Sequence, residues 1–220
     1  MKFVLFTLFS SAEYVAIFIL MFALFRFRFK GYRKQIALTS IILCYVSYTM
    51  RIDGMENITT IVQFILLFIL VWMLFQVQVF YAAIMSFTAF FGYGLIQGIV
   101  VLIFSMLGLL KISDIQENSL TGYTLQIGTA IIFSSIGWLI RKTNKGFDFV
   151  PTSIHGRMKF TKINLFFLFV LIISSILLAF AYYIINNYKN TEDSIIFIII
   201  LVISIAMLLY LSNRKDWEDG

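Results

Sequence analysis

The stretch that decides the fold is residues 56–111, ENITTIVQFILLFILVWMLFQVQVFYAAIMSFTAFFGYGLIQGIVVLIFSMLGLLK. Between Glu56 and Lys111 it contains no charged side chain over 54 positions. A helix needs about 20 apolar residues to cross a hydrocarbon core of roughly 30 Å. The stretch is long enough for two membrane spans or for three short ones. Which of the two is correct determines the side of the membrane on which every later loop lies.

The basic residues outside the stretch favour two spans. Residues 26–34 contain five Lys and Arg side chains, and residues 141–162 contain six. Short loops rich in Lys and Arg remain in the cytoplasm. With two spans, both segments and the pair Arg214 and Lys215 fall on one side, which collects 13 of the 17 basic residues. With three spans, the loop with six charges would lie outside. We therefore predict two spans joined near residues 76–78.

The composition places most of the chain in lipid. Of its 220 residues, 61% are hydrophobic and 13% are charged, and the mean hydropathy is +0.95. The apolar runs lack the alternation of a β-barrel strand. We predict an all-α, polytopic membrane helical bundle of seven transmembrane helices in one domain, with the N-terminus outside and the C-terminus in the cytoplasm. The predicted spans are residues 3–25, 35–50, 58–75, 79–110, 123–140, 163–185 and 195–212.

Several functional classes are disfavoured. The basic residues form short clusters between apolar runs and make no extended basic face for nucleic acid. Cys44 and His155 are the only residues of their types, so a disulfide framework or multi-cysteine metal site is excluded. Cys44 lies within a predicted span and His155 in a cytoplasmic loop, too far apart for a catalytic dyad. No hydrolase, nucleotide-binding or metalloprotease motif occurs. We expect no enzyme activity, no cofactor and no metal.

Glu13 is a carboxylate within the first predicted span, TLFSSAEYVAIFIL (7–20). A carboxylate in hydrocarbon is costly unless it is paired, protonated or hydrated. If the first two spans form a hairpin, Arg51 lies about one turn further out than Glu13 and can reach it with its long side chain. Three interpretations remain open for this pair: a structural link between helices, a ligand-binding site, or a proton-coupling carboxylate.

Two glutamines and two glycines complete the candidate site residues. Gln63 and Gln97 either hydrogen-bond between helices or line a polar pocket shared with Glu13. Gly94 and Gly98 form a GxxxG pattern, which lets helix backbones approach closely. The glycines therefore predict packing inside the bundle, with a homodimer seam or a bend in a long helix as alternatives.

The chain resembles the membrane sensor portion of peptide-pheromone receptor histidine kinases, of the accessory-gene-regulator type found in Gram-positive bacteria. It also resembles small stand-alone membrane proteins of spore-forming bacteria. In the kinases the last span continues into a phosphorylated helix and an ATP-binding domain, a half that we expect to be absent here because the chain ends at Gly220. The resemblance rests on FALFRFRFKGYRKQI (22–36), WMLFQVQVFYAAIM (72–85), KGFDFVP (145–151) and MLLYLSNRK (207–215).

The resemblance implies a ligand-sensing or accessory subunit of a bacterial plasma membrane, acting through a separate signalling or transport protein. A peptide or amphipathic ligand would enter an outer cavity near Glu13, Arg51 and Gln63. The basic cytoplasmic loops would contact the anionic lipid of the bilayer or a partner protein. A small transporter or permease component is one alternative function. An assembly scaffold, or homodimer, built on Gly94 and Gly98 is another.

Overall fold

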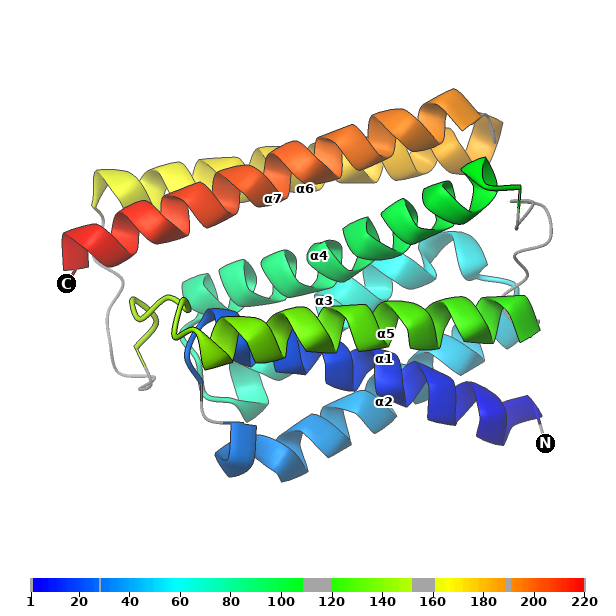
Figure 1. Ribbon diagram of the computed structural model, residues 1–220, viewed down its shortest axis with the longest axis horizontal. Coiled ribbons are helices and arrows are strands. Elements are labelled where there is room, and N and C mark those ends of the chain that lie inside the picture. The colour runs from blue at the N-terminus through cyan, green and yellow to red at the C-terminus, as the bar shows by residue number, and fades with distance from the viewer. Residues whose placement is uncertain (1, 28, 109–119, 152–160, 189–190, 220) are drawn as a thin grey trace.

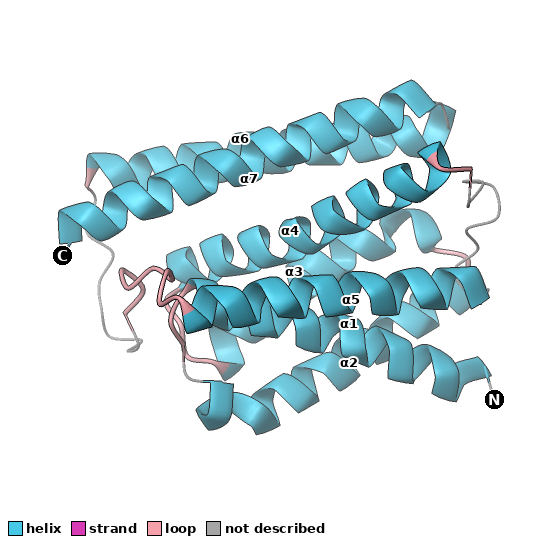
Figure 2. Ribbon diagram, in the orientation of Figure 1, coloured by secondary structure: helices cyan, strands magenta, loops and turns pink. Residues whose placement is uncertain are grey.

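The computed structural model describes residues 2–27, 29–108, 120–151, 161–188 and 191–219. Within these ranges the chain is all-α, as predicted, and no strand is present. Figure 2 shows that helices make up most of the described residues. The elements are α1 (Lys2–Leu24), the 3-10 helix η1 (Phe29–Tyr32), α2 (Arg33–Ile52), α3 (Glu56–Leu74), α4 (Val79–Met106), α5 (Leu120–Lys142), α6 (Lys162–Tyr188) and α7 (Thr191–Asp219).

Successive helices run back and forth along the long axis of the molecule (Figure 1). The uncharged stretch of residues 57–110 supplies two helices, because α3 ends at Leu74 and α4 begins at Val79. One end of the bundle therefore holds the α1–α2, α3–α4 and α5–α6 connections together with the end of α7. We call it the basic end, because Arg26, Arg33, Lys34, Arg141, Lys142, Lys145, Arg214 and Lys215 lie there.

Six helices are long and apolar enough to cross a membrane, which makes this chain a multi-pass membrane protein by length and composition. The exception among the described helices is α3, whose apolar part covers only Ile58–Leu74. The seventh span thus stays a prediction. The last predicted span, 195–212, is shorter than α7, which continues to Asp219. The charged residues after 212 remain helical because Lys215 is a buried residue of the helix and packs into the bundle.

The most extensive helix contact among the described residues is between α1 and α5. Both helices run towards the basic end, and Gly137 allows their backbones to touch. A Cβ atom on Gly137 would lie 3.0 Å from Ile19 Cγ2 and 3.1 Å from Leu20 Cα, which leaves no room for a larger residue. The half of α1 nearer the basic end, residues 16–25, is almost entirely buried. This pattern is expected for a helix that is apolar on all sides.

The α6–α7 pair lies beside the other five helices and contacts them chiefly through α4 (Figure 1). Unlike the α6–α7 pair, α4 packs within the body, because it contacts α1, α3 and α5 as well as α7. Its buried residues Phe80, Ala82, Ile84 and Met85 form much of the core near the basic end. The bundle thus consists of a five-helix body, α1–α5, with a helical hairpin packed against one side of it.

Candidate functional site

Glu13 lies at the midpoint of α1, beside polar groups of three other helices. The Tyr93 hydroxyl of α4 hydrogen-bonds with Glu13. The same hydroxyl lies 3.2 Å from the backbone carbonyl of Gln126 in α5, and because it has one proton it donates to Gln126 or to Glu13, but not to both at once. On the α2 side, Cys44 Sγ lies 3.4 Å from Ser11 Oγ. We call Ser11, Glu13, Cys44, Tyr93, Gln126 and Thr129 the Glu13 cluster.

Two buried atoms of the Glu13 cluster have no hydrogen-bond partner among the described residues. They are the side-chain oxygen of Gln126 and the hydroxyl of Thr129, which lies one turn further along α5. Thr129 is fully buried. Buried polar atoms in proteins are nearly always paired with protein or with ordered water. The cluster therefore has the capacity to bind an additional polar group, such as a ligand donor or water.

Arg51 lies in the last turn of α2, further from the basic end than Glu13, and packs against an aromatic ring. Its guanidinium carbon is 5.2 Å from the centroid of the Phe6 ring, two turns before Glu13 on α1. Tyr14 is buried and lies within the electrostatic reach of both charges. The structure thus places Glu13 and Arg51 on neighbouring helices, as expected for a hairpin. A direct ion pair between them stays a prediction.

The two glutamines occupy different surroundings. Gln63 is buried on α3, and its side-chain nitrogen has no partner among the described residues. Gln97 is half-buried on α4, one turn beyond Tyr93. Their predicted share in one pocket with Glu13 stays a prediction.

The two glycines of the GxxxG pattern have different environments. A Cβ atom on Gly98 would lie 3.3 Å from Ile198 Cδ1, so this glycine faces α7. A Cβ atom on Gly94 would meet nothing within 4 Å, and this residue is exposed. Gly98 thus contributes to the contact between the five-helix body and the α6–α7 pair. Gly94 leaves an open face on α4.

A second group of polar contacts joins three parts of the chain at the basic end. The Phe147 N–H donates to the Leu24 carbonyl at 2.6 Å. The next residue, Asp148, lies with its carboxylate 3.7 Å from an Arg26 nitrogen, and its N–H donates to Asp216 Oδ1 at 2.6 Å. These five residues, which we call the clasp, connect the end of α1 to α7 through the α5–α6 loop.

Lys215, next to the clasp on α7, is a buried ammonium, with only 3% of its surface exposed. Its Nζ donates to the Tyr81 hydroxyl at 3.2 Å and to Asn164 Oδ1. It also lies 5.5, 4.7 and 5.2 Å from the ring centroids of Phe80, Tyr81 and Phe149. Cation–π contacts of this kind are stronger when water is excluded. We call these four partners of the ammonium the Lys215 cage.

The sequence identified Glu13 and Arg51 as candidate site residues, but it did not identify Lys215, Tyr93 or Gln126. Lys215 stands in LSNRKDWED, where it reads as one more charge of a cytoplasmic tail. The helical period contains a usable signal, because buried Leu201, Leu208 and Leu211 lie on one face of α7 that Lys215 continues. His155, the predicted solvated loop residue, lies outside the described residues.

Fold and site together define a multi-pass helical membrane protein with a polar cluster midway along its helices and a charged, aromatic contact network at one end. No group of three or more His, Cys, Asp or Glu side chains that could hold a metal occurs in the described part of the chain. The chain matches no protein-family model, no curated protein and no solved structure.

Proposed function

We propose that this chain is a non-enzymatic sensor or regulatory subunit of a bacterial plasma membrane. The Glu13 cluster accepts a polar group of a peptide or amphipathic ligand, and the basic end passes the ligand's presence to a separate protein. The observation that carries the proposal is the pair of unpartnered buried atoms on the side chains of Gln126 and Thr129. They belong to the segment of α5 whose Gln126 carbonyl shares the Tyr93 hydroxyl with the Glu13 carboxylate. A purely structural cluster gains nothing from leaving such atoms unpaired.

A single helix connects the proposed ligand site to the proposed output site. From Glu13 to Leu24, α1 covers 11 residues, or about 17 Å at 1.5 Å per residue. Leu24 and Arg26 then contact the α5–α6 loop, which contacts Asp216 on α7. A ligand that shifts or rotates α1 would therefore change the clasp through this helix.

The stretches that resemble the receptor kinases meet in this part of the molecule. Leu24 and Arg26 come from the first stretch, Phe80 and Tyr81 from the second, Asp148 and Phe149 from the third, and Lys215 from the fourth. All of these residues belong to the clasp or to the Lys215 cage. Their convergence supports an output role for the basic end. A kinase or transport protein that responds to this end would be the partner.

The test is to purify tagged wild type, Glu13→Gln and Asp53→Asn from the native membrane in mild detergent and to identify co-purifying peptides and amphiphiles by mass spectrometry. Both substitutions convert a carboxylate to an amide, but Asp53 is exposed beyond α2. We expect a compound that accompanies wild type and Asp53→Asn and falls about tenfold in Glu13→Gln, because a charge-assisted hydrogen bond is lost.

The same variants separate the sensor from the transporter. Equal compound content in all three proteins would refute the proposed ligand site. Solute flux in proteoliposomes that is abolished by Glu13→Gln and kept by Asp53→Asn would instead identify Glu13 as part of a transport pathway. Size-exclusion profiles of the three proteins verify that a lost compound is not a lost fold.

A further inference from the structure

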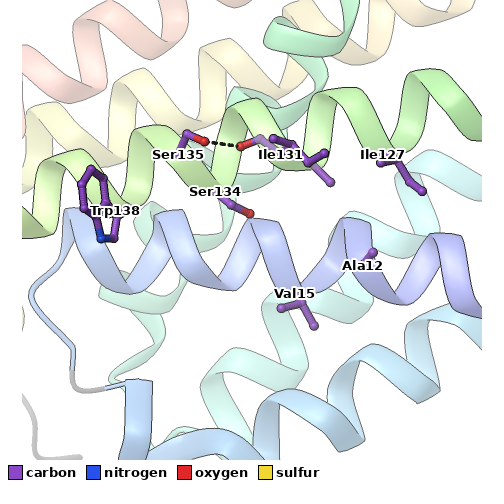
Figure 3. A pocket seen from close by; sticks show the side chains of 8 residues that line it. Ala12, Val15, Ile127, Ile131, Ser134, Ser135 and Trp138 are labelled. Carbon is purple, nitrogen blue, oxygen red and sulfur yellow. Dashed lines mark hydrogen bonds between the residues drawn. The ribbon is translucent and has the colours of Figure 1, made fainter.

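A groove of about 510 Å³ follows the seam between α1 and α5 on the outer surface of the bundle (Figure 3). The small residues Ala12 and Ser134 line it together with the larger Ile127, Ile131 and Trp138. From Ile127 to Trp138 it spans 11 residues of α5, about 17 Å along the helix. One leaflet of the hydrocarbon core is about 15 Å thick. The groove thus has the length of one leaflet and an apolar lining.

A second cavity, of about 220 Å³, lies further along the same seam at the basic end. Arg141, one turn after Trp138, lines it together with Arg26 and Asn144. Arg26 donates to the Asn144 carbonyl at 2.8 Å and lies 3.7 Å from the Asp148 carboxylate. Since a guanidinium has five N–H donors, these contacts leave donors on Arg26. The cavity therefore offers two guanidinium groups at the end of an apolar groove.

The aromatic residue between the two cavities indicates where the membrane surface lies. Trp138 is exposed, and Lys142 Nζ lies 4.8 Å from the centroid of its ring. Tryptophan prefers the boundary between hydrocarbon and headgroups. The groove therefore lies at acyl-chain depth, while Arg26 and Arg141 lie at headgroup depth. This order, apolar then cationic, is the order of a phospholipid from tail to phosphate.

We propose that the α1–α5 seam is a specific binding site for one anionic phospholipid of the leaflet at the basic end. One acyl chain occupies the groove, and the phosphate is held between Arg26 and Arg141, whose planar donors suit phosphate oxygens. Because Arg26 also contacts Asp148 of the clasp, the bound phosphate shares a guanidinium with the contacts that join α1 to α7. The lipid would thus act on the proposed output end independently of any ligand at Glu13.

The test measures thermal unfolding of the delipidated, detergent-purified full chain with added dioleoylphosphatidylglycerol, dioleoylphosphatidylcholine or inorganic phosphate. We expect the phosphatidylglycerol to raise the midpoint and the phosphatidylcholine, with identical chains, to have little effect. Half-saturation should need about tenfold more lipid in Arg141→Gln, which loses a charge-assisted contact. Lys34→Gln, an exposed basic residue at the same end outside both cavities, should behave as wild type.

The groove is tested separately with Ser135→Leu, which fills it from an exposed position. Its control is Ala206→Leu, an equally exposed small residue on α7. The proposal predicts a lost response to phosphatidylglycerol in the first variant and a normal one in the second. Equal responses to the two lipids, an unchanged response in Arg141→Gln, or the full effect with inorganic phosphate alone would each overturn it. These readouts are unaffected by failure of the Glu13 proposal.

Discussion

Lys215 shows how much one side chain can do in a bundle whose core is otherwise apolar. Its ammonium binds Tyr81 of α4 and Asn164 of α6 while it belongs to α7. A buried ammonium is tolerated only when its protons are hydrogen-bonded and its charge is compensated. The two oxygens and the faces of three aromatic rings supply this compensation. Lys215 thus fixes the positions of three helices relative to one another.

We predict that Lys215→Met lowers the stability of the protein by about 1–3 kcal/mol, because Asn164 and Tyr81 then lose a charged donor in a buried place. Lys34→Met is the matched control, since it removes an exposed ammonium at the same end. Unfolding of both variants by titration with a denaturing detergent measures the difference. Equal midpoints for the two variants would show that the cage contributes nothing.

Only some of the residues of the candidate site could be predicted from the sequence. Glu13 could be predicted because a lone carboxylate in an apolar run is conspicuous. Tyr93 and Gln126 could not, since tyrosine and glutamine are common in apolar helices and nothing local shows which ones share a layer with Glu13. Their contact depends on how α4 and α5 pack around α1, which is a property of the assembled bundle.

The packing of α1 on α5 is the contact on which both proposed sites depend. The Glu13 cluster, the groove and the clasp all use residues of α1 together with residues of α5 or of the loop after it. The positive-inside rule predicted that both helices run in the same direction, but it does not say which helices are neighbours. The apolar residues of both helices are spread around the helix surface, so no hydrophobic stripe identifies the face that contacts a partner.

Gly137→Ala should weaken this contact. The added methyl group would meet the backbone of Leu20 at 3.1 Å, and backbone cannot move aside as a side-chain tip can. We expect a loss of about 1–3 kcal/mol from the overpacked site. Gly128→Ala, on the same helix with no atom within 4 Å of its added Cβ, should gain up to about 1 kcal/mol from helix propensity. We expect the detergent-titration midpoint to fall relative to wild type in Gly137→Ala and to rise in Gly128→Ala.

For the whole molecule, the sequence predicted the helices and their alternation better than it predicted their arrangement. Charge clusters placed the connection near 76–78, and the structure has it between Leu74 and Val79. The separate α6–α7 pair was not predicted, because the burial of a helix face depends on partners that lie far away in the sequence. The orientation in the membrane rests on the charge asymmetry of the two ends alone.

The predicted orientation can be tested with single introduced cysteines, because native Cys44 is buried and should not react. We expect Asp53→Cys to react with a membrane-impermeant maleimide in intact cells. Lys145→Cys, exposed at the basic end, should react only after the membrane is opened, since Lys- and Arg-rich loops are retained in the cytoplasm. The reverse pattern would place the N-terminus in the cytoplasm and the basic end outside.

The clasp also has a consequence for how the protein is made. Asp148 and its acceptor Asp216 are 68 residues apart, and ribosomes add about 5–20 residues per second. The α5–α6 loop is therefore in place roughly 3–14 s before the side chain that completes its contacts is synthesised. During that interval the five-helix body presents an unfinished surface at the basic end, on which a nascent-chain factor or an early-binding partner would have no competition from α7.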